Sequence, residues 1–547
     1  MPPAVFPAAP SERYSNAAIA SAHPLATQAA YRILKKGGNA FDAAVALAAA
    51  LAVVEPYSSG LGGGGFWLLH RASDGQEVML DARETAPRGA TPSLYLDERG
   101  AVIPKASLRG PIAAAIPGTP AALDYLARHY GRLPLKVSLA DAIHYARSGF
   151  AVDARYAAMA RRFQGQLTGE SRRLFLDYGS VPQAGFVLKQ KELAATLQKI
   201  ASQGAAGFYR GRIAQEMVAT VQNGGGIWET DDLKNYRVIE RRPVQFAYHS
   251  LKITSASLPS AGGLTLAQSL NILSALPFDT ADAATQAHFV AEALRRAYQD
   301  RARYLGDADF VSVPVERLMS KDYAAARAAT IDPAQATPSA QLGGIPEAYG
   351  EGADTTHFSI VDREGNRVAA TLSINTPFGS GFVAGNTGVL LNNEMDDFSV
   401  APGVPNAYRL RGFYGNEIAP GKRPLSSMSP TFVEDQRGIL ILGTPGGSRI
   451  ISMVLLALLD YAGAPRFDLD AMLRLPRYHH QFLPDRIEIE PREFSEDWIR
   501  KLQAKGHVIS QSGRRWGNMQ AVYIDKLTRH AEAASDPRGE GGGLGGY

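Results

Sequence analysis

The sequence predicts an α+β fold, because helical segments and antiparallel strand pairs both occur along the chain. Near the N-terminus, two segments of helical composition are separated by Gly37-Gly38. Further on, two apolar runs flank a turn at Asp74-Gly75, and the strand-like runs TTHFSIV and VAATLSIN flank the loop DREGN. Strands joined by such short turns are antiparallel neighbours, so we expect antiparallel pairs at both places.

The composition excludes several classes of protein. With 547 residues, 45% of them hydrophobic and 20% charged, the chain is long enough to bury a large core. The 57 basic and 53 acidic residues give a charge of +4 without any run of like charges, which argues against a nucleic-acid partner. The absence of cysteine excludes thiol catalysis, zinc-thiolate sites and disulfides.

The first elements are predicted to be a helical hairpin. Helical composition runs from Pro24 to Lys36 and stops at Gly37-Gly38, after which Asn39 can cap a second, alanine-rich helix. The most apolar window of the chain, residues 40–56, includes this second helix. It contains Asp42 and is shorter than the roughly 20 residues that a membrane span needs. We therefore expect a buried helix and no membrane span.

The next elements follow from composition and turns. FWLLH (66–70) and EVMLDAR (77–83) are predicted to form an antiparallel pair. Later helices are predicted around Leu193–Ser202, Arg212–Gln222 and Thr285–Leu305. The segment from Asp332 to Asp354 is rich in Pro, Gly, Ala and Ser and is predicted to be a surface loop. A strand then begins where this loop ends.

The hairpin after the loop is predicted to gather polar side chains. If Val361 pairs with Arg367, the antiparallel register places Thr355 opposite Ser373. The same register places His357 opposite Thr371. Alternation then puts Thr355, Thr371, Ser373 and Asn375 on one face and Phe358, Ile360, Leu372 and Ile374 on the other. The apolar face would then pack in the core, and the polar face would carry the catalytic groups. The pattern alone also fits a half-buried strand with an ordinary solvated face.

The position of Thr355 favours catalysis over that alternative. An internal threonine hydroxyl is a poor nucleophile. A threonine at a newly formed N-terminus carries its own base, an α-amine with a pKa of roughly 7.7 to 8.0. Cleavage before Thr355 would therefore create the catalyst.

Several motifs together identify a family resemblance. The block from DTTHFSIV to NNEMDDFS, followed by KRPLSSMSPTF, GTPGGSRI and RYHHQFLPD, resembles the small subunit of γ-glutamyltransferases. GGNAFDAAVA, SSGLGGGGF, LDARETAP, IPGTPAA and ARYLGDADF resemble the large subunit. The likeness runs from about Ala18 to Tyr547, and the motifs occur in the same order as in the family. Their joint occurrence is not explained by chance.

The resemblance implies a fold and a maturation step. The fold is a four-layer αββα sandwich, the N-terminal nucleophile hydrolase fold. Self-cleavage between Asp354 and Thr355 would give a large subunit, 1–354, and a small subunit, 355–547, which stay together as a heterodimer. Thr355 would accept the γ-glutamyl group as an ester and pass it to water or to an amine. No cofactor and no metal are implied.

The segment GTPGGSR precedes an apolar run that should be a helix. Gly446 and Gly447 could present backbone N–H groups to a developing oxyanion at this helix N-terminus. The sequence alone fits a tight turn equally well. A phosphate loop is excluded because no Gly-Lys-Ser/Thr follows. The resemblance favours the oxyanion role.

The resemblance also implies residues that hold the two charges of a glutamyl substrate. Those matching the α-carboxylate site are Arg83, Ser426 and Ser427, and those matching the α-ammonium site are Asn375, Glu394 and Asp397. A lone Arg or Asp is more often a surface charge, so these assignments depend on the family.

Three matching positions carry further information. Ser373 stands where many members have threonine, which keeps a hydroxyl beside Thr355, and Glu394 stands where several bacterial members have glutamine. Tyr408 matches a lid tyrosine of bacterial members that related cephalosporin acylases tend to lack. It therefore favours γ-glutamyl substrates, unless it is simply an exposed loop aromatic.

Three other signals are discounted. Gly62–Gly65 is interpreted as close backbone packing rather than a ligand loop. His479-His480 has no partner at metal-ligand spacing, so no metal site is expected. The C-terminal GEGGGLGGY is flexible by composition, but chains of the family end similarly, so a packed tail is the alternative.

The leading hypothesis is a transferase and hydrolase of glutathione and other γ-glutamyl compounds, with amino acids or peptides as acceptors. The alternatives are a glutaryl acylase of the same fold and an uncleaved binding protein without catalysis. The N-terminal MPPAVFPAAPSERYSN has neither the basic nor the apolar region of a secretory signal. Bacterial members of the family are usually exported, so a periplasmic or secreted location is the family expectation.

Overall fold

The structure, a computed structural model, describes residues 11–343, 355–401, 404–407, 409–410, 414–539 and 542–546. Two predicted residues, Asp354 and Tyr408, lie outside these ranges. Among the described residues, no helix is long and apolar enough to cross a membrane.

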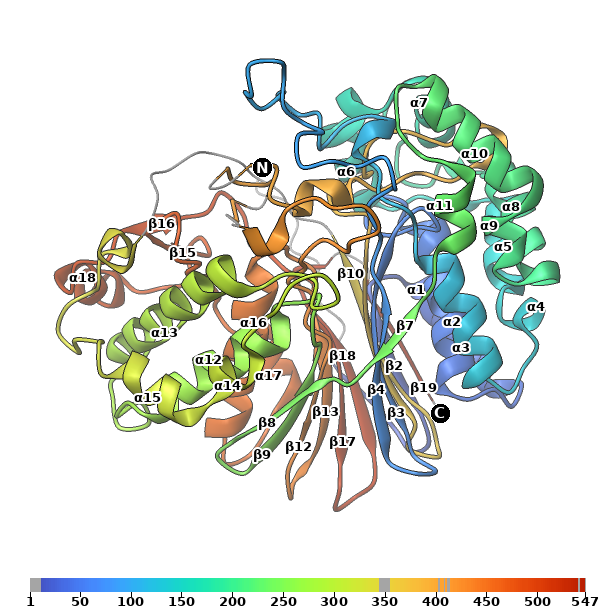
Figure 1. Cartoon of the computed structure of the whole chain (residues 1–547). Helices are drawn as coiled ribbons and strands as arrows, with labels where there is room; N and C mark the ends of the chain where they lie inside the picture. Colours follow the sequence, from blue (N-terminus) through green and yellow to red (C-terminus); the bar gives the residue numbers. More distant parts are fainter. Residues whose placement is uncertain are drawn as a thin grey trace.

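Two antiparallel sheets of seven strands lie face to face, and helices cover the outer side of each (Figure 1). Sheet I has the order β19-β2-β10-β11-β3-β4-β7. Its strands are β19 Gly543–Gly546, β2 Ala18–Ser21, β10 Thr356–Val361, β11 Arg367–Ser373, β3 Gly64–Arg71, β4 Gln76–Ala82 and β7 Ile239–Arg241. The predicted four-layer αββα sandwich is confirmed.

Sheet II has the order β1-β18-β17-β13-β12-β9-β8. Its strands are β1 Glu12–Tyr14, β18 Ala531–Ser535, β17 Gln520–Asp525, β13 Gly438–Gly443, β12 Thr431–Glu434, β9 Leu251–Ser255 and β8 Val244–Tyr248. Small and branched side chains, including Ala20, Ala369, Ile441 and Val522, fill the space between the sheets. Two short sheets lie outside the sandwich: β14 Tyr478–His479, β15 Ile487–Ile489 and β16 Ile509–Gln511 form one, and β5 Phe150–Ala151 and β6 Val187–Leu188 form the other.

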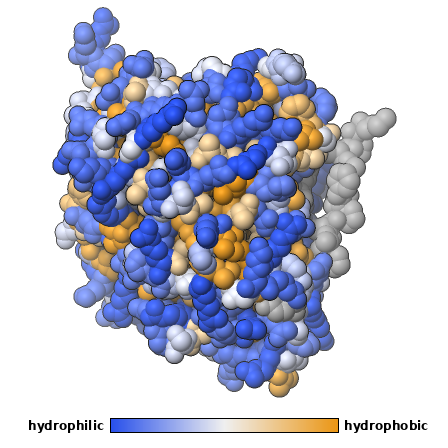
Figure 2. All heavy atoms as spheres, turned by 90° about the vertical axis from the view of Figure 1, so that its right-hand side faces the viewer, coloured by the Kyte–Doolittle hydropathy of each residue, from blue (hydrophilic) through white to orange (hydrophobic). Residues whose placement is uncertain are grey.

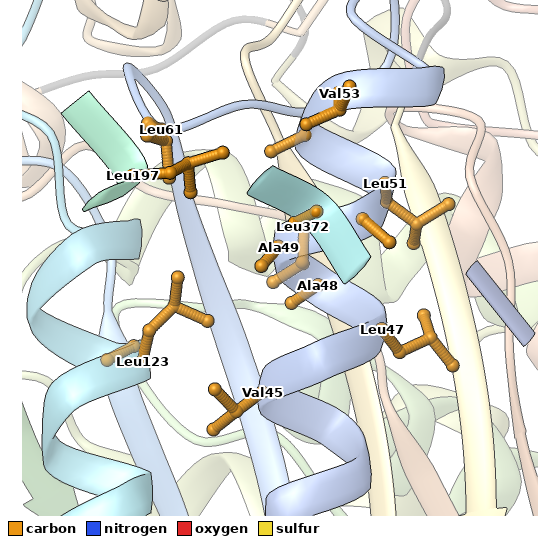
Figure 3. Packing of buried hydrophobic residues seen from close by; sticks show 14 of the residues in the cluster. Val45, Leu47, Ala48, Ala49, Leu51, Val53, Leu61, Leu123, Leu197 and Leu372 are labelled. Carbon is orange, nitrogen blue, oxygen red and sulfur yellow. The ribbon is translucent and has the colours of Figure 1, made fainter. Parts of the chain in front are cut away.

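The helical layer beside sheet I is built around one buried helix, α2. Asn39 caps this helix through a capping box with Asp42, and all fifteen residues of α2 are buried. Figure 3 shows its valine, leucine and alanine side chains packed toward Leu61, Leu123, Leu197 and Leu372. Alanine suits this position because the sheet lies on one side of α2 and outer helices lie on the other.

The outer face of this layer carries mainly hydrophilic side chains with hydrophobic ones between them (Figure 2). The helices of the layer and of its upper end are α1 Pro24–Lys35, α2 Ala40–Val54, α3 Thr119–His129, α4 Leu135–Ser138, α5 Ala140–Ser148, α6 Ala154–Phe163, α7 Gly169–Phe175, α8 Lys191–Gln203, α9 Ala206–Tyr209, α10 Gly211–Asn223 and α11 Thr230–Asn235.

The helical layer beside sheet II contains α12, α13 and α16, whose apolar sides join the core of that sheet (Figure 1). The helices on this side are α12 Gly262–Ser274, α13 Ala283–Tyr304, α14 Val315–Met319, α15 Lys321–Ala328, α16 Arg449–Gly463, α17 Leu469–Arg474 and α18 Glu496–Ala504. The predicted helical hairpin, the three later helices and both predicted strand pairs are thus confirmed.

The C-terminal glycine-rich tail is packed, which is the alternative given above, and is not flexible as its composition suggested. Gly543–Gly546 forms the edge strand β19, which pairs with β2. The Thr27 hydroxyl of α1 also donates to the carbonyl oxygen of Gly543 at 3.0 Å. Composition suggested flexibility because it counts the entropy of glycine, but here glycine lets the backbone approach α1 closely. The predicted loop is also not wholly irregular, since Ser339–Leu342 forms a 3₁₀ turn.

Candidate active site

Thr355 directly precedes β10, and its hydroxyl oxygen is 3.4 Å from that of Ser373. The register of β10 and β11 produces this contact, with Val361 opposite Arg367 and His357 opposite Thr371, as predicted. Both hydroxyl residues are buried. The Ser373 hydroxyl also accepts from the backbone N–H of Asn375 at 2.8 Å, which fixes its position beside Thr355.

The predicted division of this hairpin into a core face and a chemical face is correct only at its end. Phe358, Ile360 and Leu372 pack into the core around α2, as expected. The polar face, however, is covered by sheet II, because Ser359 Oγ donates to the carbonyl oxygen of Gln520 at 3.0 Å. Most of this face therefore joins the two sheets, and only the end near Thr355 borders a cavity.

His357 lies on this covered face. Its Nδ1 is 2.8 Å from Thr371 Oγ1, and its Nε2 is 3.2 Å from Ser359 Oγ. Burial lowers the pKa of His357 to about 3, so the imidazole is neutral in the folded protein.

Glycines bring the neighbouring strand close to the site. A Cβ atom on Gly63 would lie 2.1 Å from the carbonyl oxygen of Ser373. Every residue larger than glycine would push these strands apart. The interpretation of Gly62–Gly65 as close backbone packing is confirmed.

One small cavity of about 20 Å³ borders Thr355. This volume is comparable to that of one water molecule, so the site is closed in this structure. Nine predicted residues line the cavity: Arg83, Thr355, Ser373, Asn375, Glu394, Asp397, Ser426, Ser427 and Gly447. The fold thus brings together residues that are up to 364 positions apart in the chain, from Arg83 to Gly447.

The two halves of the predicted substrate clamp bind each other in this closed cavity. Arg83 Nη1 lies 2.7 Å from Glu394 Oε1, and its Nη2 lies 2.5 Å from Asp397 Oδ2. Arg83 Nε donates to the carbonyl oxygen of Pro424 at 3.1 Å. A zwitterionic substrate would exchange these internal ion pairs for its own carboxylate and ammonium.

Burial shapes the protonation of the carboxyl groups near Arg83. It raises the pKa of Glu84 to about 8 and the pKa of Glu394 well above its usual range. Burial also raises the pKa of Asp397, while Arg83 opposes that rise. A cation that entered the cavity would stabilise the ionised carboxylates and lower these pKa values again.

Arg301 is a site residue that sequence reasoning missed. It lies on α13, is buried, and donates from Nη2 to the Ser427 hydroxyl at 3.2 Å. Its spacing from Leu294 and Ala297 places it on the apolar stripe of the helix. A cation on an apolar stripe was the signal that could have identified it.

The turn before α16 adopts backbone angles that favour glycine. Gly446 has φ 144° and Gly447 has φ 57°. The carbonyl oxygens of Gly446 and Gly447 accept from the N–H groups of Arg449 and Ile450, each at 3.2 Å, which starts the helix. Gly447 lines the cavity beside Thr355, whereas Gly446 lines a separate depression of about 230 Å³.

Ser426 is held by the backbone of residues 259–261. Its N–H donates to the Pro259 carbonyl oxygen, and its carbonyl oxygen accepts from the Ala261 N–H, both at 2.9 Å. The Ser426 hydroxyl accepts from the N–H of Met428 at 3.1 Å. These bonds fix Ser426 at the cavity wall.

Within the described part of the chain, one group of side chains has the spacing of a metal site: His288, Glu292 and His507. The Glu292 carboxylate already pairs with Arg295 at 3.0 Å and Arg296 at 2.6 Å. Since a metal would have to displace two buried guanidinium groups, the donor set does not fit an ion. His479, which was considered for metal, instead has Nδ1 2.8 Å from Ser452 Oγ.

Comparisons with known proteins agree with this geometry. The family model described as "Gamma-glutamyltranspeptidase" matches residues 26–546. The chain is 40% identical over 538 residues to a glutathione hydrolase proenzyme of Escherichia coli strain K12, covering 96% of this chain and 91% of that relative.

Two solved structures are also similar. A cephalosporin acylase from Bacillus halodurans is 28% identical with a TM-score of 0.85, covering 100% of this chain and 99% of that one. A chain of Helicobacter pylori γ-glutamyltranspeptidase is 40% identical with a TM-score of 0.57, covering 60% of this chain and 96% of that one. The two facing antiparallel sheets are therefore those of an N-terminal nucleophile hydrolase fold. This chain belongs to the γ-glutamyltranspeptidase family.

Proposed function

We propose that this protein is a γ-glutamyltransferase and glutathione hydrolase that matures by cutting itself between Asp354 and Thr355. The observation that carries the proposal is the small cavity beside Thr355, which we call the catalytic cavity. Thr355 lines it beside the Ser373 hydroxyl, and a buried arginine and two carboxyl groups line it as well. A nucleophile and a clamp for a zwitterion are the groups that transfer of a γ-glutamyl group needs.

Two comparisons support the maturation step. The relative from Escherichia coli is named a proenzyme. The Helicobacter pylori chain covers 60% of this chain, and residues 1–354 make up a similar share. The proposed products are a large subunit, 1–354, and a small subunit, 355–547.

The proposed chemistry uses Thr355 twice. In maturation, its hydroxyl attacks the carbonyl carbon of Asp354, the peptide C–N bond breaks, and water hydrolyses the resulting ester. In turnover, the freed α-amine takes the hydroxyl proton while Oγ attacks the γ-carbonyl carbon of the substrate. The proton passes to the leaving amine, and water or an amino acid or peptide then attacks the γ-glutamyl ester.

The other cavity residues have proposed roles in binding and charge stabilisation. Backbone N–H groups at Gly446 and Gly447 receive the oxyanion at the start of α16, where the helix dipole favours negative charge. The serine hydroxyls and Arg83 receive the α-carboxylate, and Arg301 orients Ser427. The residues proposed for the α-ammonium are Asn375, Glu394 and Asp397, and Tyr408 is proposed to cover the site.

A second candidate is a glutaryl acylase, because the cephalosporin acylase matches the whole fold. A glutaryl chain has a carboxylate but no α-ammonium. It would leave Asp397 and Glu394 without a substrate cation in a buried cavity, which is unfavourable. The two carboxyl groups therefore favour γ-glutamyl substrates.

Intact-mass analysis combined with release of a chromophore from a γ-glutamyl anilide tests the proposal. We expect two fragments, the smaller beginning at Thr355, together with chromophore release. Thr355→Ala should give one inactive chain, while Thr355→Ser should still process. Two fragments that release chromophore from a glutaryl anilide alone would support the acylase, and a fully active Thr355→Ala protein would exclude the mechanism.

The location proposed for the enzyme is the periplasm or the extracellular space. The support is the family membership of the chain, and fractionation of cells that express the native gene would test it.

A further inference from the structure

A second and much larger cavity, of about 490 Å³, lies beside the catalytic cavity. Ser448 lines both, so the two spaces are neighbours at the start of α16. Thr376 and Arg449, which follow catalytic-cavity residues in the chain, also line the larger space. We call this larger cavity the basic vestibule.

The lining of the vestibule is strongly asymmetric in charge. Among the described residues that line it, seven are lysine or arginine, and Glu488 is the one carboxylate. Glu488 is shared by three of the guanidinium groups: Arg449 at 2.7 Å, Arg486 at 3.0 Å and Arg409 at 3.3 Å. Basic side chains thus outnumber acidic ones in the described lining, and such a surface attracts anions.

The basic residues come from both proposed subunits. Arg109 and Arg162 belong to the first 354 residues, and Arg162 lies near the end of α6. Arg449 begins α16, and Arg486 precedes β15. Figure 1 shows α6 and β15 at the same end of the sandwich, above the strands. Arg449 is also held over the Trp516 ring at 5.1 Å, so part of this surface is rigid.

The position of the vestibule indicates which part of a substrate it receives. The γ-glutamyl group is bound by the charged groups of the small cavity when Thr355 carries it as an ester. The leaving amine and the acceptor amine occupy the same side of that ester, because deacylation by an amine is the reverse of acylation. The vestibule adjoins the small cavity at Ser448, so it is the neighbouring space in which that part of a substrate could lie.

We propose that the basic vestibule binds short acidic peptides, either as the leaving part of a γ-glutamyl donor or as the acceptor. This inference rests on the proposed γ-glutamyl transfer at Thr355. With an acidic acceptor, its amine attacks the ester carbonyl, the C–O bond to Thr355 breaks, an amide C–N bond forms, and the amine proton passes to Thr355 Oγ. Arginine side chains suit this role since a guanidinium binds a carboxylate through two parallel hydrogen bonds.

The test compares two donors that differ only in charge. One is γ-glutamyl-glutamyl-glutamate, and the other is γ-glutamyl-glutaminyl-glutaminamide. The variant is Arg109→Gln with Arg162→Gln, two exposed substitutions that spare the catalytic cavity. The matched control is Arg147→Gln, an exposed arginine on α5 outside the vestibule.

We expect the wild type to prefer the acidic donor in kcat/KM, and this preference to weaken as salt is added. In the double variant, the ratio of acidic to neutral kcat/KM should fall by about threefold to tenfold, as the loss of two exposed charge pairs implies. The control should retain the full ratio. Equal kcat/KM for both donors in the wild type, or an equal loss on both donors in the variant, overturns the proposal.

Calorimetry with the dipeptide Glu-Glu separates this inference from the proposed function. If no γ-glutamyl compound is turned over, the proposed function fails. Tighter binding of Glu-Glu than of Gln-Gln amide, lost in the double variant, then still supports an acidic-peptide site. Equal or undetectable binding of both dipeptides rejects it.

Discussion

Asp397 shows how a buried charge in the site depends on its partners. Its carboxylate pairs with Arg83 at 2.5 Å and accepts from Asn406 at 3.1 Å. We expect Asp397→Asn to keep its shape and self-cleavage but to lose the charge that is proposed to receive the substrate ammonium. A hydrogen bond to a charged group contributes about 1.5 to 3 kcal/mol, so KM for a γ-glutamyl anilide should rise about tenfold to a hundredfold.

The measurement is steady-state kinetics together with a denaturing gel. Asp279→Asn, at an exposed position outside the cavity, serves as the control and should match the wild type. An unchanged KM in processed Asp397→Asn would show that this carboxylate does not contact the substrate.

His357 predicts a pH dependence of stability. Its pKa is about 3 in the folded protein because it is buried, and its ordinary value is 6.5. The unfolded chain therefore binds a proton more readily, and stability that is complete above pH 6.5 is lost as the pH falls toward 3. Between pH 7 and pH 5 this one group should remove about 2 kcal/mol from the free energy of unfolding.

The variant His357→Gln lacks this titration, so its stability relative to the wild type should improve as the pH falls. Urea unfolding of both proteins at pH 7 and pH 5 measures the change. If the difference in unfolding free energy between the two proteins is the same at both pH values, His357 is not the buried titrating group described here.

For single residues, the sequence predicted which side chains lie at the candidate site better than it predicted how those side chains interact. Thr355 and Ser373 were placed opposite each other by alternation and loop length alone. The pairing of Arg83 with Glu394 and Asp397 was missed, because no sequence pattern reports which charges meet across 300 residues. Arg301 was missed for the same reason, although its place on an apolar stripe was visible.

At the scale of elements, the turn that begins α16 joins backbone conformation to the proposed oxyanion site. A Cβ on Gly446 would lie 2.6 Å from Met453 Cε, and its φ of 144° disfavours other residues. Gly446→Ala should shift the turn and misplace the N–H groups that are proposed to receive the oxyanion. We expect kcat to fall by about a hundredfold with a smaller change in KM, as for loss of an oxyanion donor.

Gly463→Ala is the matched control, because Gly463 lies at the other end of α16 and an added Cβ atom there would have no neighbouring atom within 4 Å. It should retain wild-type kcat and a similar melting temperature. If Gly446→Ala retains kcat as well, the turn is structural and takes no part in charge stabilisation.

Elements with periodic patterns were predicted well, and an element without such a pattern was not. Capping residues and glycine stops marked α1 and α2, and alternation marked β10 and β11. The strand β19 has no pattern of its own, since four residues of glycine and leucine take their structure from β2 and α1. Tertiary contacts there outweigh local propensity.

At the scale of the whole molecule, the proposed cut divides a structure whose two parts are interleaved. In sheet I, β10 and β11 of the small-subunit segment lie between β2 and β3 of the large-subunit segment. In sheet II, β1 pairs with β18 at one side and β9 pairs with β12 at the other. Separation of the parts would break hydrogen-bonded ladders in both sheets and expose the core between them.

The cut protein should therefore remain one particle. We expect both fragments to elute together in equal molar amounts after dilution to nanomolar concentration, at the position of uncut Thr355→Ala protein. Denaturant should be required to part them, since the buried strands give the pair the character of a single core rather than of a docked complex. Size-exclusion chromatography with mass detection measures this, and elution of free small subunit in native buffer would show that the strand order described here does not hold the cleaved chain together.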